Sequence, residues 1–142
     1  AGGQSQDCEA SGQQLDLTSL ETLHRSKTGA LIKASVQLGA LCCPQLQDTE
    51  MIALQDYAEI IGLAFQVQDD ILDVTGDTET LGKPQGSDKE LDKATYVSLL
   101  GLEAARSKAA ELSDVALESL SSFPASADPL RELAAYIVNR IN

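Results

Sequence analysis

Tryptophan is absent from this chain, and aromatic residues of all kinds make up only 4% of its 142 residues. Because aromatic and β-branched residues favour strands whereas Ala and Leu favour helices, this shortage predicts packed helices rather than sheets. Proline is scarce as well, with four residues, while 43% of the chain is hydrophobic. The composition is therefore that of a folded globular domain and excludes a collagen-like or low-complexity chain.

Cysteine is also rare. Cys8, Cys42 and Cys43 fit no zinc-binding spacing, and their odd number leaves one thiol over in any disulfide scheme. We interpret them as reduced thiols without a catalytic role. The sequence contains no run of about 18 apolar residues that could span a bilayer, and no signal-peptide pattern. These absences predict a cytoplasmic protein without a membrane span.

Positive charge is missing from one long stretch. The net charge of −12 argues against nucleic acid as a partner. Residues 34–82 contain nine acidic residues and no Lys or Arg. The basic residues instead flank this block, at Arg25, Lys27, Lys33, Lys83, Lys89 and Lys93. A solvated acidic face that aids solubility explains most of the block, but it does not explain the carboxylates that cluster near its end.

That cluster is Asp69, Asp70 and Asp73, near the end of a predicted helix. Asp69 and Asp73 share a helix face with Gln66, and Asp70 lies one step round. Carboxylates so placed repel one another and oppose the helix macrodipole, so a cation facing them would explain the arrangement. Mg²⁺ suits such a site, because it takes one or two carboxylates together with phosphate and water oxygens. The spacing fails the EF-hand pattern, and the lack of nearby sulfur or imidazole disfavours zinc.

Each of these signals has a plainer interpretation when taken alone. An isolated Asp-Asp-x-x-Asp is as often a solvated helix face as a metal site. Lys27 alone is more often a surface lysine, and Lys83 and Lys93 alone carry little weight. Together, acidic residues for Mg²⁺ and lysines for phosphate predict a diphosphate substrate.

Apolar periodicity predicts helices at about 19–42, 48–74, 94–122 and 128–141, with a break near Gly101 and no strand. We expect Thr18 and Asp48 to cap the first two helices and Gly76 to end the second. Gly29, inside the first helix, predicts the close approach of another backbone or a ligand. The predicted fold is all-α, a bundle of long helices. The side chains expected to face inward include Leu20, Leu23, Leu31, Ala34, Leu38, Ile52, Tyr57, Ile61, Ala64, Phe65, Leu72, Leu102, Ala105, Ala109, Leu112, Val115, Ala116 and Leu120.

Several motifs in order resemble the trans-isoprenyl diphosphate synthases, and most closely the bacterial farnesyl diphosphate synthases, or geranyltranstransferases. They are Lys27-Thr28-Gly29, residues 65–73, Gly76-Asp77, Leu81-Gly82-Lys83 and Lys93-Ala94-Thr95-Tyr96. Gly3-Gln4-Ser5-Gln6-Asp7 is similar to a further motif of the family. The ordered set covers nearly the whole chain and is far more specific than any one motif.

The resemblance implies an all-α fold in which Mg²⁺ ions join two aspartate-rich motifs to an allylic diphosphate, onto which isopentenyl diphosphate condenses. By resemblance, the metal ligands are Asp69, Asp70 and Asp73, with Asp69 the most direct, and the substrate-binding residues are Lys27, Thr28, Gln66, Lys83 and Lys93. The same resemblance assigns catalytic roles to Lys27, Asp69 and Lys83. The family also implies a homodimer.

The family's first aspartate-rich motif and its isopentenyl diphosphate site would lie upstream of residue 1. Residues 1–142 are therefore expected to form the C-terminal half of a single all-α isoprenoid synthase domain, inactive alone. Asp7 would support the metal shell. Arg140 is a candidate for the family's basic C-terminus, but the tail lacks the usual basic pair, so we assign it no role.

Three alternatives remain open. A terpene synthase shares the fold, but it normally carries an Asn/Ser/Glu metal triad that is not found here. A non-catalytic subunit of a heteromeric synthase is expected to lose its aspartates, whereas Asp69, Asp70 and Asp73 are all present. A purely structural acidic bundle does not account for the ordered motifs.

Overall fold

A computed structural model describes residues 16–80 and 94–140, without the side chains of residue 27 and residues 77–80. None of the described residues forms a strand, so the predicted all-α fold is confirmed. The elements are α2 (Leu17–His24), the π-helix η1 (Arg25–Gly29), α3 (Ala30–Leu41), α4 (Asp48–Thr80), α5 (Tyr96–Leu100), α6 (Leu102–Ser119), the 3₁₀ turn η2 (Ala125–Ala127) and α7 (Asp128–Asn139). Within the described ranges, no helix combines the length and the apolar character needed to cross a membrane.

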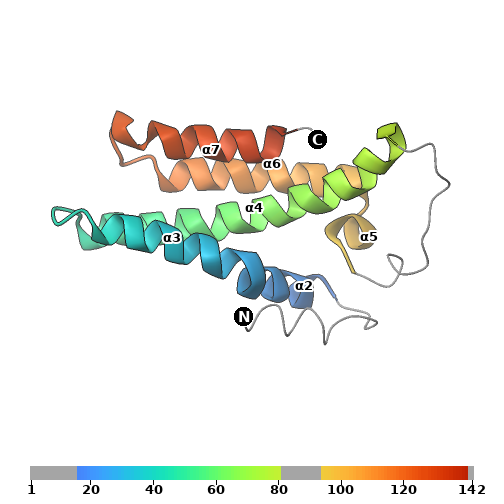
Figure 1. Ribbon diagram of the computed structural model, residues 1–142, viewed down its shortest axis with the longest axis horizontal. Helices are drawn as coiled ribbons and strands as arrows, with labels where there is room; N and C mark the ends of the chain where they lie inside the picture. The colour runs from blue at the N-terminus through green and yellow to red at the C-terminus, as the bar shows by residue number, and fades with distance from the viewer. Residues whose placement is uncertain (1–15, 81–93, 141–142) are drawn as a thin grey trace.

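The long helix α4 is the axis of the bundle. It runs between α6 and α7 on one side and α2 and α3 on the other (Figure 1). It contacts each of the other described α-helices as well as η1. Helix α4 is therefore held by elements from both the N-terminal and the C-terminal parts of the chain.

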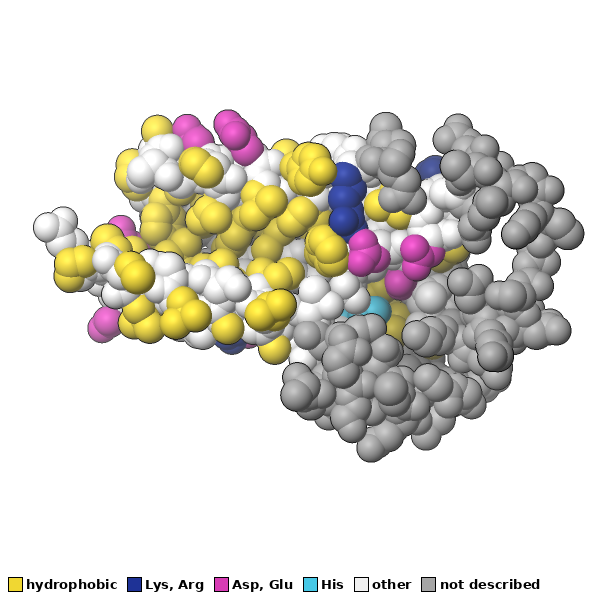
Figure 2. Space-filling view, viewed as in Figure 1, with side chains coloured by type: hydrophobic (Ala, Val, Ile, Leu, Met, Phe, Trp, Pro, Cys, Tyr) yellow, Lys and Arg dark blue, Asp and Glu magenta, His cyan; other side chains and the backbone are white. Residues whose placement is uncertain are grey.

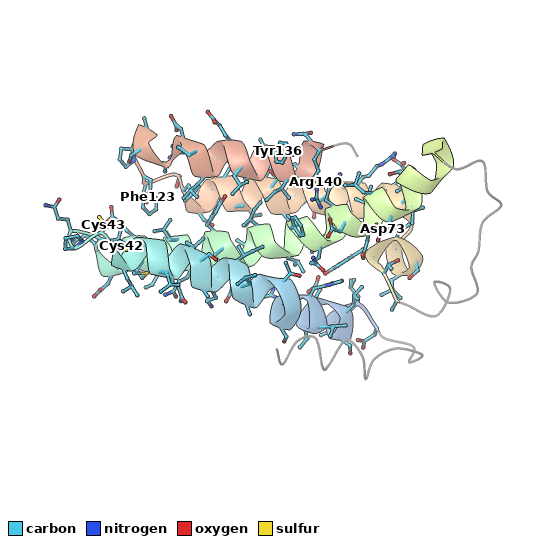
Figure 3. All side chains as sticks on the ribbon, viewed as in Figure 1. Cys42, Cys43, Asp73, Phe123, Tyr136 and Arg140 are labelled. Atoms are coloured by element: carbon cyan, nitrogen blue, oxygen red, sulfur yellow. The ribbon has the colours of Figure 1, made fainter. Side chains whose placement is uncertain are left out.

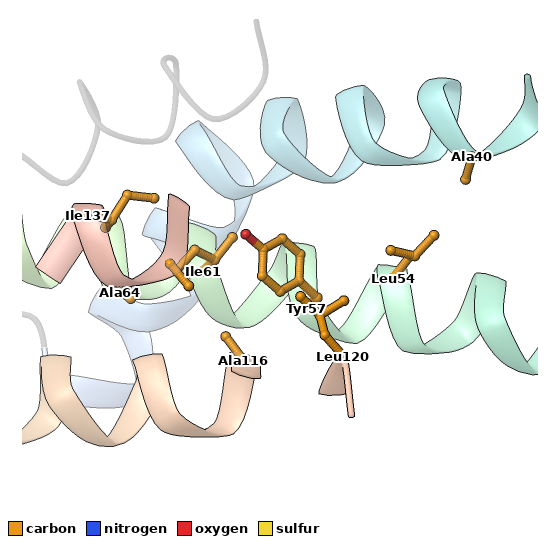
Figure 4. Packing of buried hydrophobic residues seen from close by; sticks show 9 residues of the cluster. Ala40, Leu54, Tyr57, Ile61, Ala64, Ala116, Leu120 and Ile137 are labelled. Carbon is orange, nitrogen blue, oxygen red and sulfur yellow. The ribbon is translucent and has the colours of Figure 1, made fainter. Parts of the chain in front are cut away.

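Two hydrophobic clusters stabilise this arrangement. The first surrounds Tyr57 and joins α3, α4, α6 and α7 (Figure 4). The second surrounds Tyr96 and joins α2, α4, α5 and α6. Tyr57 and Tyr96 are each at most 1% exposed, and the Tyr57 hydroxyl donates to the Leu130 carbonyl at 2.7 Å. The second cluster lies on the part of α4 that leads to the aspartates.

The π-helix η1 changes which side of α3 is buried. A π turn inserts one extra residue, so the buried stripe after it moves by one position. Ile32 and Val36 pack against the Tyr57 cluster and Ala40 is buried within it. The expected inward positions Leu31, Ala34 and Leu38 are therefore wrong: Leu31 and Leu38 are 70% and 67% exposed, and Ala34 is exposed as well.

Hydrophobic side chains remain uncovered on two helices. They are Leu31, Leu38 and Leu41 of α3 and Leu133 and Tyr136 of α7, all exposed. Figure 2 shows hydrophobic side chains spread over this view of the molecule. Helix α3 thus carries apolar side chains on both its packed and its open sides, a pattern typical of a helix inside a larger core.

Most predicted helix boundaries hold within a few residues, and the differences have local causes. The first helix begins at Leu17 because Asp16, not Thr18, is the N-cap and accepts from the Ser19 amide at 2.8 Å. The second helix continues to Thr80 instead of stopping at Gly76, since a glycine weakens a helix without forbidding it.

The break at Gly101 is confirmed, with φ +84. Two further positions expected to face inward, Ile52 and Val115, are exposed.

Candidate functional site

The polar end of α4 carries the residues predicted to form the site. Gly62, Gln66, Asp69 and Asp73 follow at spacings of four, three and four residues, so they line one face of the helix. Gln66 is 8% exposed, whereas Asp69 is half-buried and Asp73 is exposed. The stripe therefore runs from the bundle interior to its surface, and its acidic residues are at the accessible end.

The π-helix brings the Lys27-Thr28-Gly29 motif against this stripe. Gly29 is buried, and a Cβ built on Gly62 would lie 3.1 Å from the Gly29 Cα. The prediction that another backbone approaches Gly29 is thus confirmed. π-Helical turns are frequent at functional sites, and this one contains Thr28 and the backbone of residue 27.

Asp69 is paired with a residue from the other end of the chain. The Arg140 guanidinium, just past the end of α7, donates from Nη2 to Asp69 Oδ1. The same guanidinium lies over the Phe65 ring, 4.3 Å from its centroid. Arg140 and Asp73 lie at the same end of the bundle, far from Cys42 and Cys43 (Figure 3).

Asp70 faces a different neighbour. Its Oδ2 accepts from the Tyr96 amide at 2.7 Å, which satisfies a free N–H in the first turn of α5. The Tyr96 ring stacks on His24 of α2 with centroids 5.6 Å apart. Burial, followed by the charges of Glu21 and Asp70, raises the pKa of the Tyr96 hydroxyl. Asp70 thus joins α4 to α5 and, through Tyr96, to α2.

Two of the basic residues that flank the acidic block bind within the bundle. Arg25 and Lys33 both pair with Glu59 of α4, Arg25 at 3.5 Å. The hydrogen bond from Lys33 is the main cause that lowers the pKa of the Glu59 carboxyl. Glu59 therefore links η1 and α3 to α4 rather than belonging to a purely solvated acidic face.

The aspartates of this stripe suit a hard divalent cation that takes most of its ligands from water and phosphate. In the described ranges no three His, Cys, Asp or Glu side chains lie close enough to enclose a metal ion. Mg²⁺ does not need such a cage, because one or two carboxylates suffice when phosphate and water supply the rest. The Asp69 carboxylate is already paired with one positive group, the Arg140 guanidinium.

The structure thus brings Thr28, Gln66, Asp69, Asp70 and Asp73 to α4 or to the π-helix that crosses it. Lys83, Lys93 and Asp7 lie outside the described residues, as does the side chain of Lys27. Arg140 was not predicted to belong to the site, because the tail lacks the basic pair that is usual in the family. The sequence did contain one indication of its place: Arg140 follows directly after an amphipathic helix.

Comparison with known proteins gives a consistent result. The family model described as polyprenyl synthetase matches residues 1–131. The farnesyl diphosphate synthase of Escherichia coli K12 is 53% identical over 142 residues, an alignment that covers 98% of this chain and 48% of that protein. The chain spans about half the length of such relatives.

Solved structures of similar proteins have the same fold as this chain. An FPP/GFPP synthase from Zymomonas mobilis matches 96% of this chain and 44% of its own, with TM-score 0.80 and 40% identity. A geranyltransferase from Helicobacter pylori, complexed with magnesium and isoprenyl diphosphate, matches 96% of this chain and 44% of its own, with TM-score 0.70 and 38% identity.

Proposed function

Because the chain belongs to the polyprenyl synthetase family, we propose that the full-length protein is a Mg²⁺-dependent prenyltransferase. It condenses isopentenyl diphosphate with an allylic diphosphate, either dimethylallyl or geranyl diphosphate. The product is a short-chain prenyl diphosphate, most simply farnesyl diphosphate. The observation that carries this proposal is the stripe of Gln66, Asp69 and Asp73 on α4, crossed by the π-helix that contains Thr28.

Each site residue has a role in this proposal. Asp69, Asp70 and Asp73 provide the carboxylates for Mg²⁺, and Asp69 is the most direct ligand. Lys27, Lys83 and Lys93 hold the diphosphate oxygens as point charges. Thr28 and Gln66 position the allylic group. Lys27, Asp69 and Lys83 are the residues proposed to act in the chemical step.

The reaction breaks the C–O bond of the allylic diphosphate, so pyrophosphate leaves with the bonding electrons. The isopentenyl alkene forms the new C–C bond to the resulting cation, and the proton that is lost goes to the released pyrophosphate. When bound, Mg²⁺ neutralises the negative charge that develops on the leaving group. The lysines add to this stabilisation, and the apolar faces of the helices keep water from the cation.

We propose that residues 1–142 do not turn over alone. The uncovered hydrophobic side chains on α3 and α7 support this, because α3 carries apolar side chains on two sides and so requires further protein to cover it. Similarity to the H. pylori geranyltransferase supports the magnesium and diphosphate assignments. A cytoplasmic location and a homodimer are also part of the proposal.

A second candidate concerns the product. One of the matching structures is an FPP/GFPP synthase, so the second candidate product is a prenyl diphosphate longer than farnesyl diphosphate. A terpene-synthase-like reaction or a non-catalytic subunit would use the same fold, but neither accounts for an intact aspartate cluster beside the Lys27-Thr28-Gly29 motif.

The test is an assay of the full-length protein with radiolabelled isopentenyl diphosphate, Mg²⁺ and either allylic substrate. We expect a radiolabelled prenyl diphosphate, with a chain length that chromatography distinguishes as C15 or longer. Residues 1–142 alone serve as the comparison and are expected to form no product. If the full-length protein forms none with either allylic substrate, the proposal is wrong.

A further inference from the structure

Arg140 contacts one face of α4 through both its side chain and its backbone. Its guanidinium pairs with Asp69, lies 4.3 Å from the centroid of the Phe65 ring, and donates to the Phe65 carbonyl at 3.5 Å. In return, the Gln68 side chain donates to the Arg140 carbonyl at 3.3 Å. Phe65, Gln68 and Asp69 are three and four residues apart, so Arg140 covers a continuous part of the helix surface.

The contact between Arg140 and Asp69 has a defined position. It is nevertheless partly exposed to solvent, and one hydrogen-bond donor of Arg140 has no partner among the described residues. The Arg140 side chain is 20% exposed and that of Asp69 is 42% exposed, so solvent and ions reach the carboxylate. Arg140 Nε is buried, and no hydrogen bond to it is found among the described residues. The backbone leaves helical geometry at Arg140, with φ −62 and ψ 138. A buried donor without a partner carries a free-energy cost. This cost makes it easier for Arg140 to move away from Asp69.

We propose that Arg140 is a latch that occupies Asp69 until a divalent cation takes its place. This inference rests on the proposed function, in which Asp69 is a metal ligand, and it adds a regulatory coupling to that site. A guanidinium and a divalent cation on one carboxylate repel each other, so the binding of one weakens the binding of the other. Because such coupling is reciprocal, the cation also releases the end of α7.

The first test measures metal affinity directly. Mn²⁺ serves as the probe, and calorimetry gives its dissociation constant for the full-length protein without substrate. We expect Arg140→Gln to bind Mn²⁺ about fivefold more tightly, the factor by which a partly exposed ion pair can oppose a competing charge. Arg106→Gln is the matched control, because Arg106 pairs only with Glu103 on the exposed side of α6 among the described residues. Equal or weaker binding by Arg140→Gln would overturn the latch.

The second test measures the reverse effect. Trypsin cleaves after Arg140, and mass spectrometry follows the rate at which the segment that follows Arg140 is lost. We expect saturating Mn²⁺ to accelerate this cleavage in the wild-type protein. In Asp69→Asn the cleavage should be fast with or without the metal. If Mn²⁺ slows the wild-type cleavage or leaves it unchanged, the latch is overturned.

These experiments separate the latch from the proposed function. If Asp69→Asn keeps wild-type Mn²⁺ affinity, Asp69 is not a metal ligand, and both proposals lose their basis. If Asp69→Asn loses Mn²⁺ binding while Arg140→Gln matches wild type, the metal assignment stands and only the latch is wrong.

Discussion

Gly29 and Gly62 face each other where the π-helix crosses α4, so closely that a Cβ on Gly62 would lie 3.1 Å from the Gly29 Cα. This spacing is tighter than an ordinary van der Waals contact, and the neighbouring atom belongs to a helix backbone. The crossing holds the Lys27-Thr28-Gly29 motif one helical turn from Gln66. Any change that separates the two backbones also moves that motif away from the aspartates.

We therefore expect Gly62→Ala to destabilise the protein by about 1–3 kcal/mol, the usual cost of overpacking. Gly39→Ala is the matched control, because a Cβ there meets nothing within 4 Å. Replacing a helical glycine without steric conflict should instead stabilise by up to about 1 kcal/mol. Urea denaturation measures both changes, and equal effects of the two substitutions would contradict a close crossing.

Arg131 closes the end of α6. Its Nη2 donates to the carbonyls of Leu120, the C-cap of α6, at 2.7 Å and of Phe123, in the following turn, at 2.8 Å. The Leu120 carbonyl also accepts from the Phe123 amide at 3.1 Å. Arg131→Met keeps the aliphatic stem but removes these bonds, and should lower the free energy of unfolding by about 2 kcal/mol. Arg106→Met, which loses a single exposed ion pair, should cost less than about 0.5 kcal/mol. Thermal unfolding that ranks the two variants equally would show that the cap contributes nothing.

Tyr57 gives the fold a dependence on alkaline pH. Burial raises the pKa of its hydroxyl to about 12, above the ordinary value of 10.0. Because the neutral form is the one favoured in the fold, this contribution is complete below pH 10 and is lost as the pH rises toward 12. Tyr57→Phe should therefore lose less stability than wild type between pH 10 and 12, measured by urea unfolding. It should also cost about 1 kcal/mol at pH 8, where the bond to Leu130 is missing. Parallel pH curves for the two proteins would refute the assignment.

Asp70 is predicted to order the start of α5. Asp70→Ala removes the acceptor for the Tyr96 amide, so hydrogen exchange of that amide should become faster by about tenfold, the factor that corresponds to the loss of one charge-assisted hydrogen bond. Asp70→Asn keeps an acceptor oxygen and should change the rate less. The measurement is made without metal, so that any role in metal binding does not contribute. Unchanged exchange in Asp70→Ala would mean that α5 is held by its capping box and Tyr96 packing alone.

Local patterns in the sequence predicted the helices well. The break at Gly101 and the crossing at Gly29 could be predicted because each glycine marks a backbone requirement within its own segment. The buried side of α3 could not be predicted. The π turn that shifts it depends on packing against α4, and it leaves no periodic signal in the sequence. Leu31 and Leu38 consequently fit a helical stripe that the structure does not bury.

The site residues also divide into those that could be predicted from the sequence and those that could not. The Asp69–Asp73 cluster could be found because its members share one helix and a fixed spacing. Arg140 lies 71 residues from Asp69, and only the path of α7 beside α4 brings them together. Arg131 likewise reaches carbonyls that its own helix does not contain. Pairings of this kind depend on tertiary structure, which a single sequence does not specify at the level of individual contacts.

We propose above that Asp69 serves a metal-dependent transfer of a prenyl group. The most direct measurement compares the turnover of isopentenyl and geranyl diphosphate by full-length wild type, Asp69→Asn and Asp56→Asn at saturating Mg²⁺. Asp56 is an exposed carboxylate on the same helix, so it controls for loss of charge from α4. We expect Asp69→Asn to lower kcat by at least about 100-fold, on the scale of one lost electrostatic contact to a transition state, while Asp56→Asn stays within about twofold of wild type. Equal turnover by all three proteins would contradict this proposal.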